Sequence, residues 1–401
     1  MNSVNTKHDA ASYESLSGYQ REILYDANAL YQAFLNAKRG SDWKPQVQKY
    51  EMNYLINLAN MQEEIKNYTY QFLPSTDFVI NERGKTRVIH GEQMPDRTIK
   101  HVLCDEVLNP EIAKYLIFDN AASQKGKGIA FTRRRLLHHL QRYYRTHGNN
   151  EGYILLIDYS KYYDNIRHDV LMELFKKYIK DERALWLLQT TIERSKVDVS
   201  YMTDEEYENS MNSLFNSLEH ERVDNKLLTG KRMMNKHLNI GDQVAQTAGI
   251  AYPILIDNYI KNVKGMKYYA RYMDDSYIIH ESKEYLQELL QEIIKIASGI
   301  GIIINTKKTH ICKLSDRWRF LQVQYSLTDT GRIIQKINPK RLTAMRRKMK
   351  KVACKMTEKE FCDWYKSWFR GYYKIMSKQQ RKNMDELYNK LKGECKCIKS
   401  N

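Results

Sequence analysis

The sequence predicts an α+β fold in which amphipathic helices cover one face of an antiparallel sheet. Residues 153–157 form an apolar run that is typical of a buried strand and ends at Asp158. Residues 268–272 and 276–280 are two more apolar runs, and they enclose a short polar turn at residues 273–275, as in a β-hairpin. A helical pattern follows the first run and another follows the hairpin. This order of elements favours a layer of helices on a sheet.

The N-terminal part of the chain changes from a helical to a mixed pattern. Residues 13–70 are expected to be helical, because their apolar positions recur at spacings of three and four. Residues 71–130 contain shorter apolar runs broken by turn residues, so strands are expected there. The helical stripe comprises Tyr50, Tyr54, Leu55, Leu58, Met61 and Ile65.

The second half of the chain holds two clear helical patterns. One helix is expected over residues 170–179, with Asp169 as its N-cap. The other helix is expected to begin after Ser282 as its N-cap, and a strand over residues 301–305 should follow it. Residues 195–240 lack a clear pattern and are interpreted as an insertion or extended connection.

Composition excludes several classes of protein. The 401 residues are 42% hydrophobic at a mean hydropathy of −0.67, and no apolar run reaches the roughly 18 residues needed to span a bilayer. The N-terminus has no secretory signal pattern, and none of the six cysteines forms a CxxC pair. We therefore expect a cytoplasmic protein with reduced thiols, without a structural zinc site and without a membrane partner.

Positive charge is concentrated near the C-terminus. The net charge is +17, and residues 326–401 hold 21 Lys and Arg against 7 Asp and Glu, a net charge of +14. A basic segment attached to a nearly neutral body indicates a binding surface for a polyanion such as nucleic acid. A solvated face of a lysine-rich protein is the alternative.

Three carboxylates occupy strand ends. Asp158 ends an apolar strand, and Asp274 and Asp275 lie in the turn between two others. Like charges that come within a few ångströms of one another repel, and either a raised pKa or a bound cation resolves the conflict. Oxygen ligands without His or Cys favour Mg²⁺ over zinc. The alternative is that Asp158 caps a turn and the other two make a polar hairpin.

The residues at these positions also resemble a known family. Tyr272-Met273-Asp274-Asp275 resembles the YxDD box of reverse transcriptases, and residues 158–164 resemble their first catalytic motif. The resemblance is to bacterial stand-alone enzymes of the group II intron-like, diversity-generating retroelement-like and defence-associated kinds. It implies a right-hand polymerase with fingers, a ferredoxin-like palm and a helical thumb. Further matches in the family's order, within residues 72–325, are residues 82–97 and 120–128 in the fingers, 241–246 in the nucleotide loop, 304–309 in the palm and 320–324 in the primer grip.

The resemblance implies a two-metal catalytic site. Asp158 and Asp274 would hold both ions, with Asp275 assisting and the main-chain carbonyl of Tyr159 as a further ligand. Mg²⁺ is the expected ion, and Mn²⁺ is a substitute. Lys308 would be a catalytic proton donor to pyrophosphate, with a plain surface lysine as the alternative.

The resemblance also implies a nucleotide site. Lys85 and Arg87 would hold the triphosphate, although a solvated loop is the alternative. Tyr163 matches the aromatic residue that excludes a ribose 2′-hydroxyl and so favours dNTPs, although it would otherwise be a core aromatic. Gly241 and Gln243 belong to the loop under the incoming nucleotide.

Four domains are expected, together with a set of basic contacts to nucleic acid. The domains are an N-terminal helical extension (1–70), fingers (71–152), a palm (153–325) with an inserted connection (195–240), and a basic helical thumb (326–401). The expected contacts are Arg97, Lys125, Lys127, Lys340, Arg346, Arg347 and Lys350.

Together these inferences predict an RNA-directed DNA polymerase that extends a 3′-hydroxyl with dNTPs. Its partners would be an RNA template, a DNA or RNA primer, and a dedicated non-coding RNA or accessory protein. Two alternatives stay open: an untemplated or protein-primed DNA polymerase in a bacterial antiphage defence system, and a catalytically silent RNA-binding protein with a polymerase fold. Retroelement functions and antiviral defence are both compatible with this chemistry.

Overall fold

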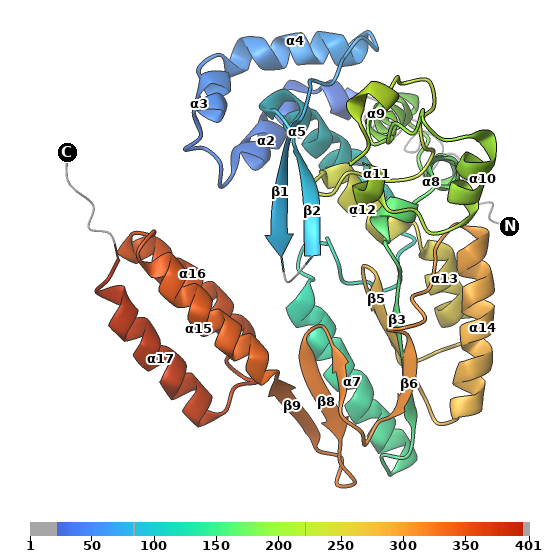
Figure 1. Cartoon of the computed structure of the whole chain (residues 1–401), viewed down its shortest axis with the longest axis vertical. Coiled ribbons are helices and arrows are strands. Elements are labelled where there is room, and N and C mark those ends of the chain that lie inside the picture. Colours follow the sequence, from blue (N-terminus) through green and yellow to red (C-terminus); the bar gives the residue numbers. More distant parts are fainter. Residues whose placement is uncertain (1–21, 83–84, 221, 396–401) are drawn as a thin grey trace, which may run out of the picture. The chain divides into compact units, whose positions relative to one another are not determined.

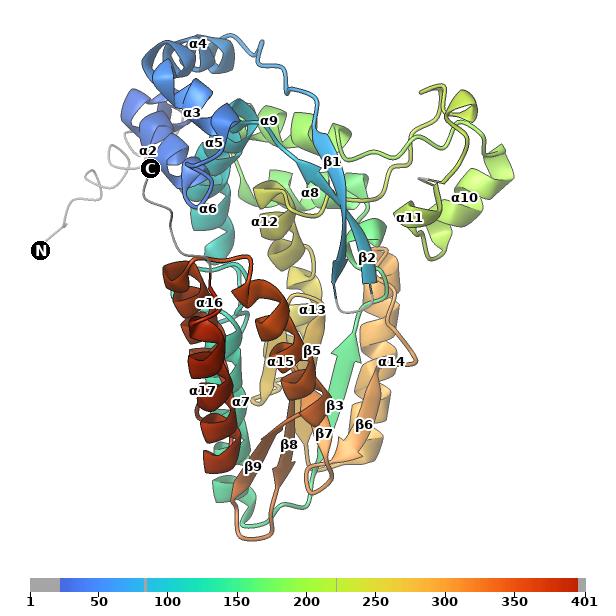
Figure 2. The same ribbon diagram turned by 60° about the vertical axis from the view of Figure 1, so that its left-hand side comes forward.

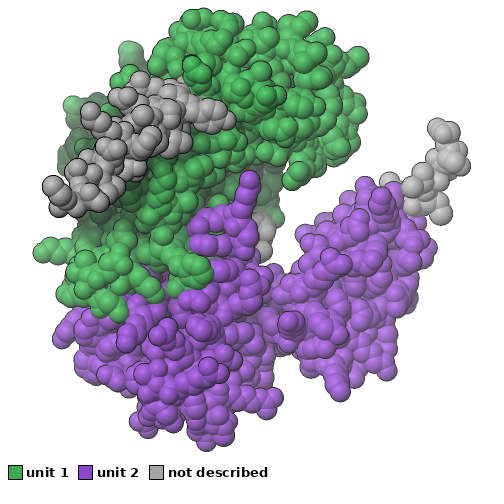
Figure 3. Space-filling model, turned by 180° about the vertical axis from the view of Figure 1, so that it is seen from behind, with its two compact units in different colours: residues 1–123, 159–265, 291–305 green, residues 124–158, 266–290, 306–401 purple. Residues whose placement is uncertain are grey.

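The computed structural model describes residues 22–82, 85–220 and 222–395. The chain divides into two compact units, which Figure 3 shows in different colours. Unit 1 comprises residues 1–123, 159–265 and 291–305, and unit 2 comprises residues 124–158, 266–290 and 306–401. Each unit therefore brings together three stretches that are far apart in the sequence.

Unit 2 is built on a four-stranded antiparallel sheet with the strand order β4-β5-β3-β6. The apolar run of β3 lies inside this sheet, where Ile154 and Leu155 have no exposed surface. Burial of both faces explains why this run is continuously apolar rather than alternating. The strands are β3 (Tyr153–Asp158), β4 (Tyr269–Tyr272), β5 (Asp275–His280) and β6 (His310–Lys313).

In the described part of the chain, unit 2 also contains a second antiparallel sheet and four whole helices. The second sheet has the order β7-β8-β9, and the two-residue turn between β7 and β8 has positive φ at Leu321 and Gln322. One continuous core joins both sheets to the helices, and Figure 1 shows α15, α16 and α17 side by side. The elements are α7 (Ile129–His147), β7 (Trp318–Phe320), β8 (Val323–Leu327), β9 (Ile333–Ile337), α15 (Pro339–Ala353), α16 (Glu358–Tyr372) and α17 (Lys378–Lys392).

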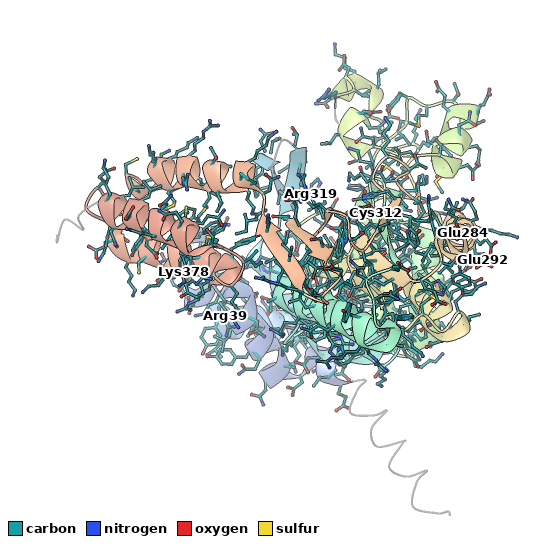
Figure 4. The ribbon with its side chains drawn as sticks, turned by 90° about the horizontal axis from the view of Figure 1, so that it is seen from below. Arg39, Glu284, Glu292, Cys312, Arg319 and Lys378 are labelled. Carbon is teal, nitrogen blue, oxygen red and sulfur yellow. The ribbon has the colours of Figure 1, made fainter. Side chains whose placement is uncertain are left out.

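The last two helices begin at capping boxes that are visible in the sequence. The Thr357 hydroxyl accepts the backbone N–H of Glu360, and the Glu360 carboxylate accepts that of Thr357. Ser377 and Gln380 repeat the arrangement at α17. Both reciprocal pairs satisfy donors that a helix N-terminus leaves free. Basic side chains of unit 2 that reach solvent include Arg319 on β7 and Lys378 on α17 (Figure 4).

Unit 1 contains an N-terminal helical group, a long hairpin and a mainly helical remainder. Figure 2 shows β1 and β2 as a two-stranded ribbon. The first elements are η1 (Ile23–Tyr25), α2 (Ala27–Lys38), α3 (Pro45–Met52), α4 (Tyr54–Lys66), β1 (Thr76–Glu82), β2 (Lys85–Gly91), α5 (Met94–Val102), η2 (Leu103–Leu108) and α6 (Asn109–Ala113). The remainder is η3 (Tyr163–Asn165), α8 (His168–Tyr178), α9 (Glu182–Glu193), α10 (Asp204–Asn212), α11 (Ser217–His220), η4 (Asn225–Leu227), α12 (Gln243–Ala251), α13 (Ile254–Asn258) and η5 (Tyr259–Val263).

The helix α14 (Lys283–Gly299) crosses the boundary between the units. Its start confirms a prediction, because the Ser282 hydroxyl accepts the backbone N–H of Tyr285 at 3.0 Å. Its end contradicts one. Gly301 has φ +79°, and the N–H of Ile302 donates to the carbonyl of Ala297 at 2.8 Å. These residues cap the helix, so the strand expected over residues 301–305 is reduced to a single bridge at Ile304.

The α+β class with antiparallel sheets is confirmed, and two further local expectations are corrected. The N-cap of α8 is Arg167, and Asp169 instead accepts from the Arg167 guanidinium at 2.6 and 3.2 Å. Asp275 is the first residue of β5 rather than part of the turn. The inserted connection, which stays an interpretation, contains the short helices α10, α11 and η4. Within the described part of the chain, no helix is long and apolar enough to cross a membrane.

Candidate active site

The end of β3 brings two of the predicted acids face to face in unit 2. The ladder between β3 and β5 pairs Asp158 directly with Asp275. Side chains of directly opposed residues share one face of the sheet, with Cβ atoms about 4.5–5.5 Å apart. Asp158 is only 8% exposed, so water screens its charge poorly. A positive group is therefore needed at this sheet edge.

Lys308 supplies positive charge to Asp158. Its ammonium lies 2.8 Å from Oδ1 and 2.9 Å from Oδ2 of that carboxylate. The Lys308 side chain is 52% exposed and that of Asp158 12%, so the lysine reaches the acid from solvent. Thr309, the residue after Lys308, fixes the end of β3, because its hydroxyl accepts the backbone N–H of Asp158 at 3.2 Å.

Asp274 lies in the tight turn that joins β4 to β5. Tyr272 pairs with Asp275, which leaves Met273 and Asp274 as the two turn residues. Met273 has φ +54°, which is a left-handed backbone conformation. A two-residue hairpin turn requires such a conformation, and residues other than glycine seldom adopt it. The turn has a strained backbone, and it places Asp274 next in sequence to the Asp158–Asp275 pair.

Arg271 is a site residue that the sequence analysis missed. It lies in β4, is fully buried, and its Nη1 donates to the carbonyl of Met273 at 3.1 Å. A buried guanidinium is costly unless it is bonded, so its retention in the strand indicates a specific role in fixing the turn. The available signal was a charged residue inside an otherwise apolar strand, two residues before the turn.

A buried histidine on α7 supports β5 through a hydrogen bond. The ring of His139 on α7 is bonded through Nδ1 to the Tyr277 hydroxyl at 2.9 Å and through Nε2 to Arg135 at 3.2 Å. Because a guanidinium can only donate, Nε2 accepts and Nδ1 carries the proton. Tyr277 is fully buried and lies two residues after Asp275, so this network anchors the strand that carries the acid.

The donors at the sheet edge suit a hard divalent cation. Among the described residues, no three His, Cys, Asp or Glu side chains form a group that could hold a metal ion. The sheet nevertheless opposes Asp158 and Asp275, and Asp274 lies in the turn directly before Asp275. Carboxylate oxygens are the ligands that Mg²⁺ and Mn²⁺ prefer, and two opposed carboxylates gain most from a cation.

Unit 1 holds the predicted nucleotide-loop residues against the β1–β2 hairpin. Gly241 has φ +108°, and a Cβ at that position would lie 3.3 Å from Cγ2 of Ile89 on β2. Gln243 begins α12, and its side-chain amide donates to Asp105 at 2.9 Å. Its carbonyl oxygen Oε1 is buried without a hydrogen-bond partner in the described part of the chain. The loop thus has a fixed backbone and a spare acceptor.

The remaining predicted nucleotide residues have different surroundings. Arg87 is half-buried on β2, whereas the side chain of Lys85 lies outside the described side chains. Tyr163 begins η3, is half-buried, and its ring centroid lies 5.5 Å from that of Tyr162. Tyr159 is buried, and its backbone forms a bridge with Ile304.

The predicted nucleic-acid contacts fall into two groups. Arg97 is occupied inside unit 1, where its guanidinium donates to the Ser41 hydroxyl at 3.0 Å and to the Ala37 carbonyl, so its contacts join α5 to the N-terminal helices. The side chains in unit 2 are more open. Lys125, Lys340, Arg347 and Lys350 are exposed, and Lys127 and Arg346 are half-buried.

Comparisons with known proteins give the family. The family model described as reverse transcriptase (RNA-dependent DNA polymerase) matches residues 80–325. Protein YkfC of Escherichia coli (strain K12) is 23% identical over 287 residues, which are 66% of this chain and 70% of that protein.

Two solved telomerase structures show weaker similarity. Telomerase from Candida albicans, in complex with a TWJ fragment of telomeric RNA, has 12% identity and a TM-score of 0.40, and the match covers 87% of this chain and 63% of that chain. Apo telomerase from Candida tropicalis has 14% identity and a TM-score of 0.40, with 66% and 48% covered. The chain thus spans about half to two thirds of these telomerase chains. Because the family model covers more than half of the sequence, the chain belongs to the reverse transcriptase family, whose members are RNA-directed DNA polymerases, a class of nucleotidyltransferase.

Proposed function

We propose that this chain extends a primer 3′-hydroxyl with dNTPs on an RNA template by two-metal nucleotidyl transfer. The observation that carries the proposal is the direct opposition of Asp158 and Asp275 at the sheet edge, with Asp274 in the adjoining strained turn. In the reaction, the primer 3′-oxygen loses its proton and bonds to the α-phosphorus. The bond from that phosphorus to the bridging oxygen breaks, and pyrophosphate leaves.

Four positions are proposed to hold the two divalent ions. Asp158 and Asp274 would bind both ions, Asp275 would assist, and the carbonyl of Tyr159 would complete the set. When bound, the ions would favour ionisation of the 3′-hydroxyl and offset charge on the leaving oxygens. Mg²⁺ is the proposed ion because every donor is an oxygen, and Mn²⁺ would substitute.

Lys308 is proposed as the proton donor to pyrophosphate. Its Nζ lies within 2.9 Å of the Asp158 carboxylate, so the amino group lies beside the acid that is proposed to bind both ions. Protonation of a leaving phosphate oxygen in the transition state lowers the barrier without metal or solvent rearrangement. Exposure of about half of the side chain gives it room to move from the acid to the leaving group.

Residues of unit 1 are proposed to bind and select the nucleotide. Lys85 and Arg87 on the hairpin would neutralise the triphosphate, as fixed cations do at phosphoryl oxygens. Gly241 and Gln243 would support the base and sugar, and the spare Oε1 of Gln243 provides an acceptor. The Tyr163 ring would exclude a ribose 2′-hydroxyl.

The nucleic acid is proposed to follow the exposed basic residues of unit 2. α15 is amphipathic: Leu342, Met345 and Met349 are buried, while Arg347 and Lys350 face solvent. This separation leaves the charged face available for phosphates. The proposed partners are an RNA template and a DNA or RNA primer, with a dedicated non-coding RNA or accessory protein as a further partner.

The testing experiment measures incorporation of labelled dNTPs by the full-length chain with Mg²⁺. A primed RNA template is compared with no added nucleic acid, for wild type, Asp274→Asn and the matched variant Asp316→Asn. Asp316 is an exposed aspartate of the same unit and is a control for loss of one carboxylate.

Extension that requires template and Asp274, but not Asp316, supports the proposal. Product without template, from protein treated with nuclease to remove co-purified RNA, would favour the untemplated or protein-primed polymerase. RNA retention without any product would favour the silent RNA-binding protein.

A further inference from the structure

A buried charged cluster in unit 1 connects three elements that are distant in sequence. Lys100 on α5 has a side chain that is 3% exposed, and its Nζ lies 2.6 Å from Oδ2 of Asp242. The same ammonium also pairs with Glu92, which follows β2. Asp242 directly precedes α12, and the two acidic side chains are 5% and 16% exposed.

The charges in this cluster depend on one another. Burial raises the pKa of Glu92, and the nearby Asp242 raises it further. Burial by itself lowers the pKa of Lys100, but Asp242 and Glu92 have the larger combined effect and raise it. A buried ion pair of this kind adds little net stability compared with apolar residues, while loss of one partner is costly. Its presence therefore favours a role in fixing geometry.

Asp242 uses its two oxygens for different purposes. Oδ2 contacts Lys100, and Oδ1 accepts the backbone N–H of Val244 at 2.8 Å, which caps α12. A single carboxylate thus joins the loop backbone to α5. The neighbouring Gln243 makes a second attachment, because its amide donates to Asp105 on η2, the continuation of α5.

The β1–β2 hairpin also approaches the loop closely. Gly241 adopts φ +108°, and its Cα approaches β2 so closely that a Cβ would lie 3.3 Å from Ile89. Glycine populates other conformations as readily, so contacts of the neighbouring residues have to hold it at this positive φ. Lys100 and Asp242 supply that constraint through their contact with each other and the bond from Val244.

We propose that Lys100 is a positioning residue that acts through Asp242 to hold the Gly241–Gln243 loop in its nucleotide-binding conformation. This inference rests on the proposed function, in which that loop lies under the incoming dNTP. Lys100 itself is buried and touches no substrate. Its loss or uncoupling should weaken dNTP binding rather than slow the chemical step.

Two isosteric substitutions separate this role from general stabilisation. Asp242→Asn removes the charge paired with Lys100, but asparagine caps helices as well as aspartate, so the bond to Val244 can remain. Glu92→Gln is the matched control, because it removes the other carboxylate from the same lysine and leaves Lys100 paired with Asp242. Thermal unfolding of both variants shows whether each is folded.

Steady-state primer extension by the full chain gives the first measurement. We expect Asp242→Asn to raise KM for dNTP about tenfold with kcat within about threefold of wild type, as loss of one charge-assisted bond at a binding loop predicts. Glu92→Gln should change KM by less than about twofold. Equal changes in the two variants, or an unchanged KM in Asp242→Asn, would overturn the proposal.

Hydrogen exchange gives a measurement that does not depend on polymerase activity. Amides of residues 241–246 should exchange at least about tenfold faster in Asp242→Asn than in wild type, and Glu92→Gln should match wild type. A wild-type chain without dNTP incorporation would refute the proposed function alone, because the exchange result still decides whether Lys100 and Asp242 fix the loop. Unchanged exchange in Asp242→Asn would refute the positioning role.

Discussion

The ammonium of Lys308 lies 2.8 and 2.9 Å from the two carboxylate oxygens of Asp158, although the residues are 150 positions apart in the sequence. The lysine therefore occupies the side of the carboxylate that a metal ion would also use. Under the proposed function, Lys308 would have two opposing effects: its ammonium would neutralise the acid, and it would compete with the cation for the same oxygens. A substitution should separate these effects.

Lys308→Met is expected to lower kcat while lowering the Mg²⁺ concentration needed for half-maximal rate. Loss of a general acid costs on the order of 100-fold in rate. Removal of the competing ammonium leaves Asp158 free for the metal. Extension rates across a Mg²⁺ titration measure both quantities, with Lys313→Met as a control on an exposed lysine of β6. An increased Mg²⁺ requirement in Lys308→Met would contradict this competition.

Arg271→Met should weaken the turn that carries Asp274. The substitution removes the 3.1 Å bond to the Met273 carbonyl and replaces a buried cation with an apolar chain. Loss of a hydrogen bond to a charged group lowers the free energy of unfolding by about 2 kcal/mol. Urea unfolding measures this change, and extension kinetics should show a lower kcat at saturating dNTP.

The exposed Arg319 on β7 provides the comparison for Arg271. Arg319→Met removes an exposed guanidinium from the same unit and leaves the turn at Met273 intact, so stability within about 0.5 kcal/mol of wild type is expected. The assignment of Arg271 to the turn fails if Arg271→Met unfolds at the wild-type urea concentration and retains the wild-type kcat.

Local sequence patterns were sufficient for the strands that carry the acids. The apolar run before Asp158 and the paired runs around Met273 predicted β3, β4 and β5 because burial and turn chemistry act over a few residues. The strand expected at residues 301–305 was wrong because Gly301 and Ile302 instead satisfy the carbonyls at the end of α14.

Contacts over long sequence distances were beyond such reasoning. Lys100 and Asp242 are 142 residues apart, and nothing local to either indicates the other. Arg271 gave a local signal, a charge inside a strand, but its acceptor is set by the left-handed turn at Met273. Which cation pairs with which acid depends on tertiary packing, and a single sequence does not contain that pairing in readable form.

His168 should make the folded state sensitive to acid. Burial lowers its pKa to about 4 from an ordinary value of 6.5, and its ring bonds through Nε2 to the His237 carbonyl at 2.6 Å. A lowered pKa means that the unfolded chain takes up a proton more readily. The contribution is therefore complete above pH 6.5 and is lost as the pH falls through about 4, a change of about 3 kcal/mol.

Denaturant unfolding between pH 4 and 7 tests this dependence. His168→Gln should show a shallower loss of stability over that range than wild type. His138→Gln, on the exposed face of α7, should retain the wild-type slope. Parallel slopes for wild type and His168→Gln would show that acid acts through other groups.

Tyr163 should determine whether the chain accepts ribonucleotides. It is half-buried at the start of η3, where the Tyr163 carbonyl accepts from Leu238 at 3.0 Å and fixes the backbone that carries the ring. Tyr163→Val removes the ring and should raise kcat/KM for rNTP relative to dNTP by about 100-fold, whereas Tyr163→Phe keeps the ring and should preserve the discrimination. Single-nucleotide extension with matched dNTP and rNTP measures the ratio. If Tyr163→Val discriminates as well as wild type, the ring is a packing residue, and sugar selection belongs to another part of unit 1.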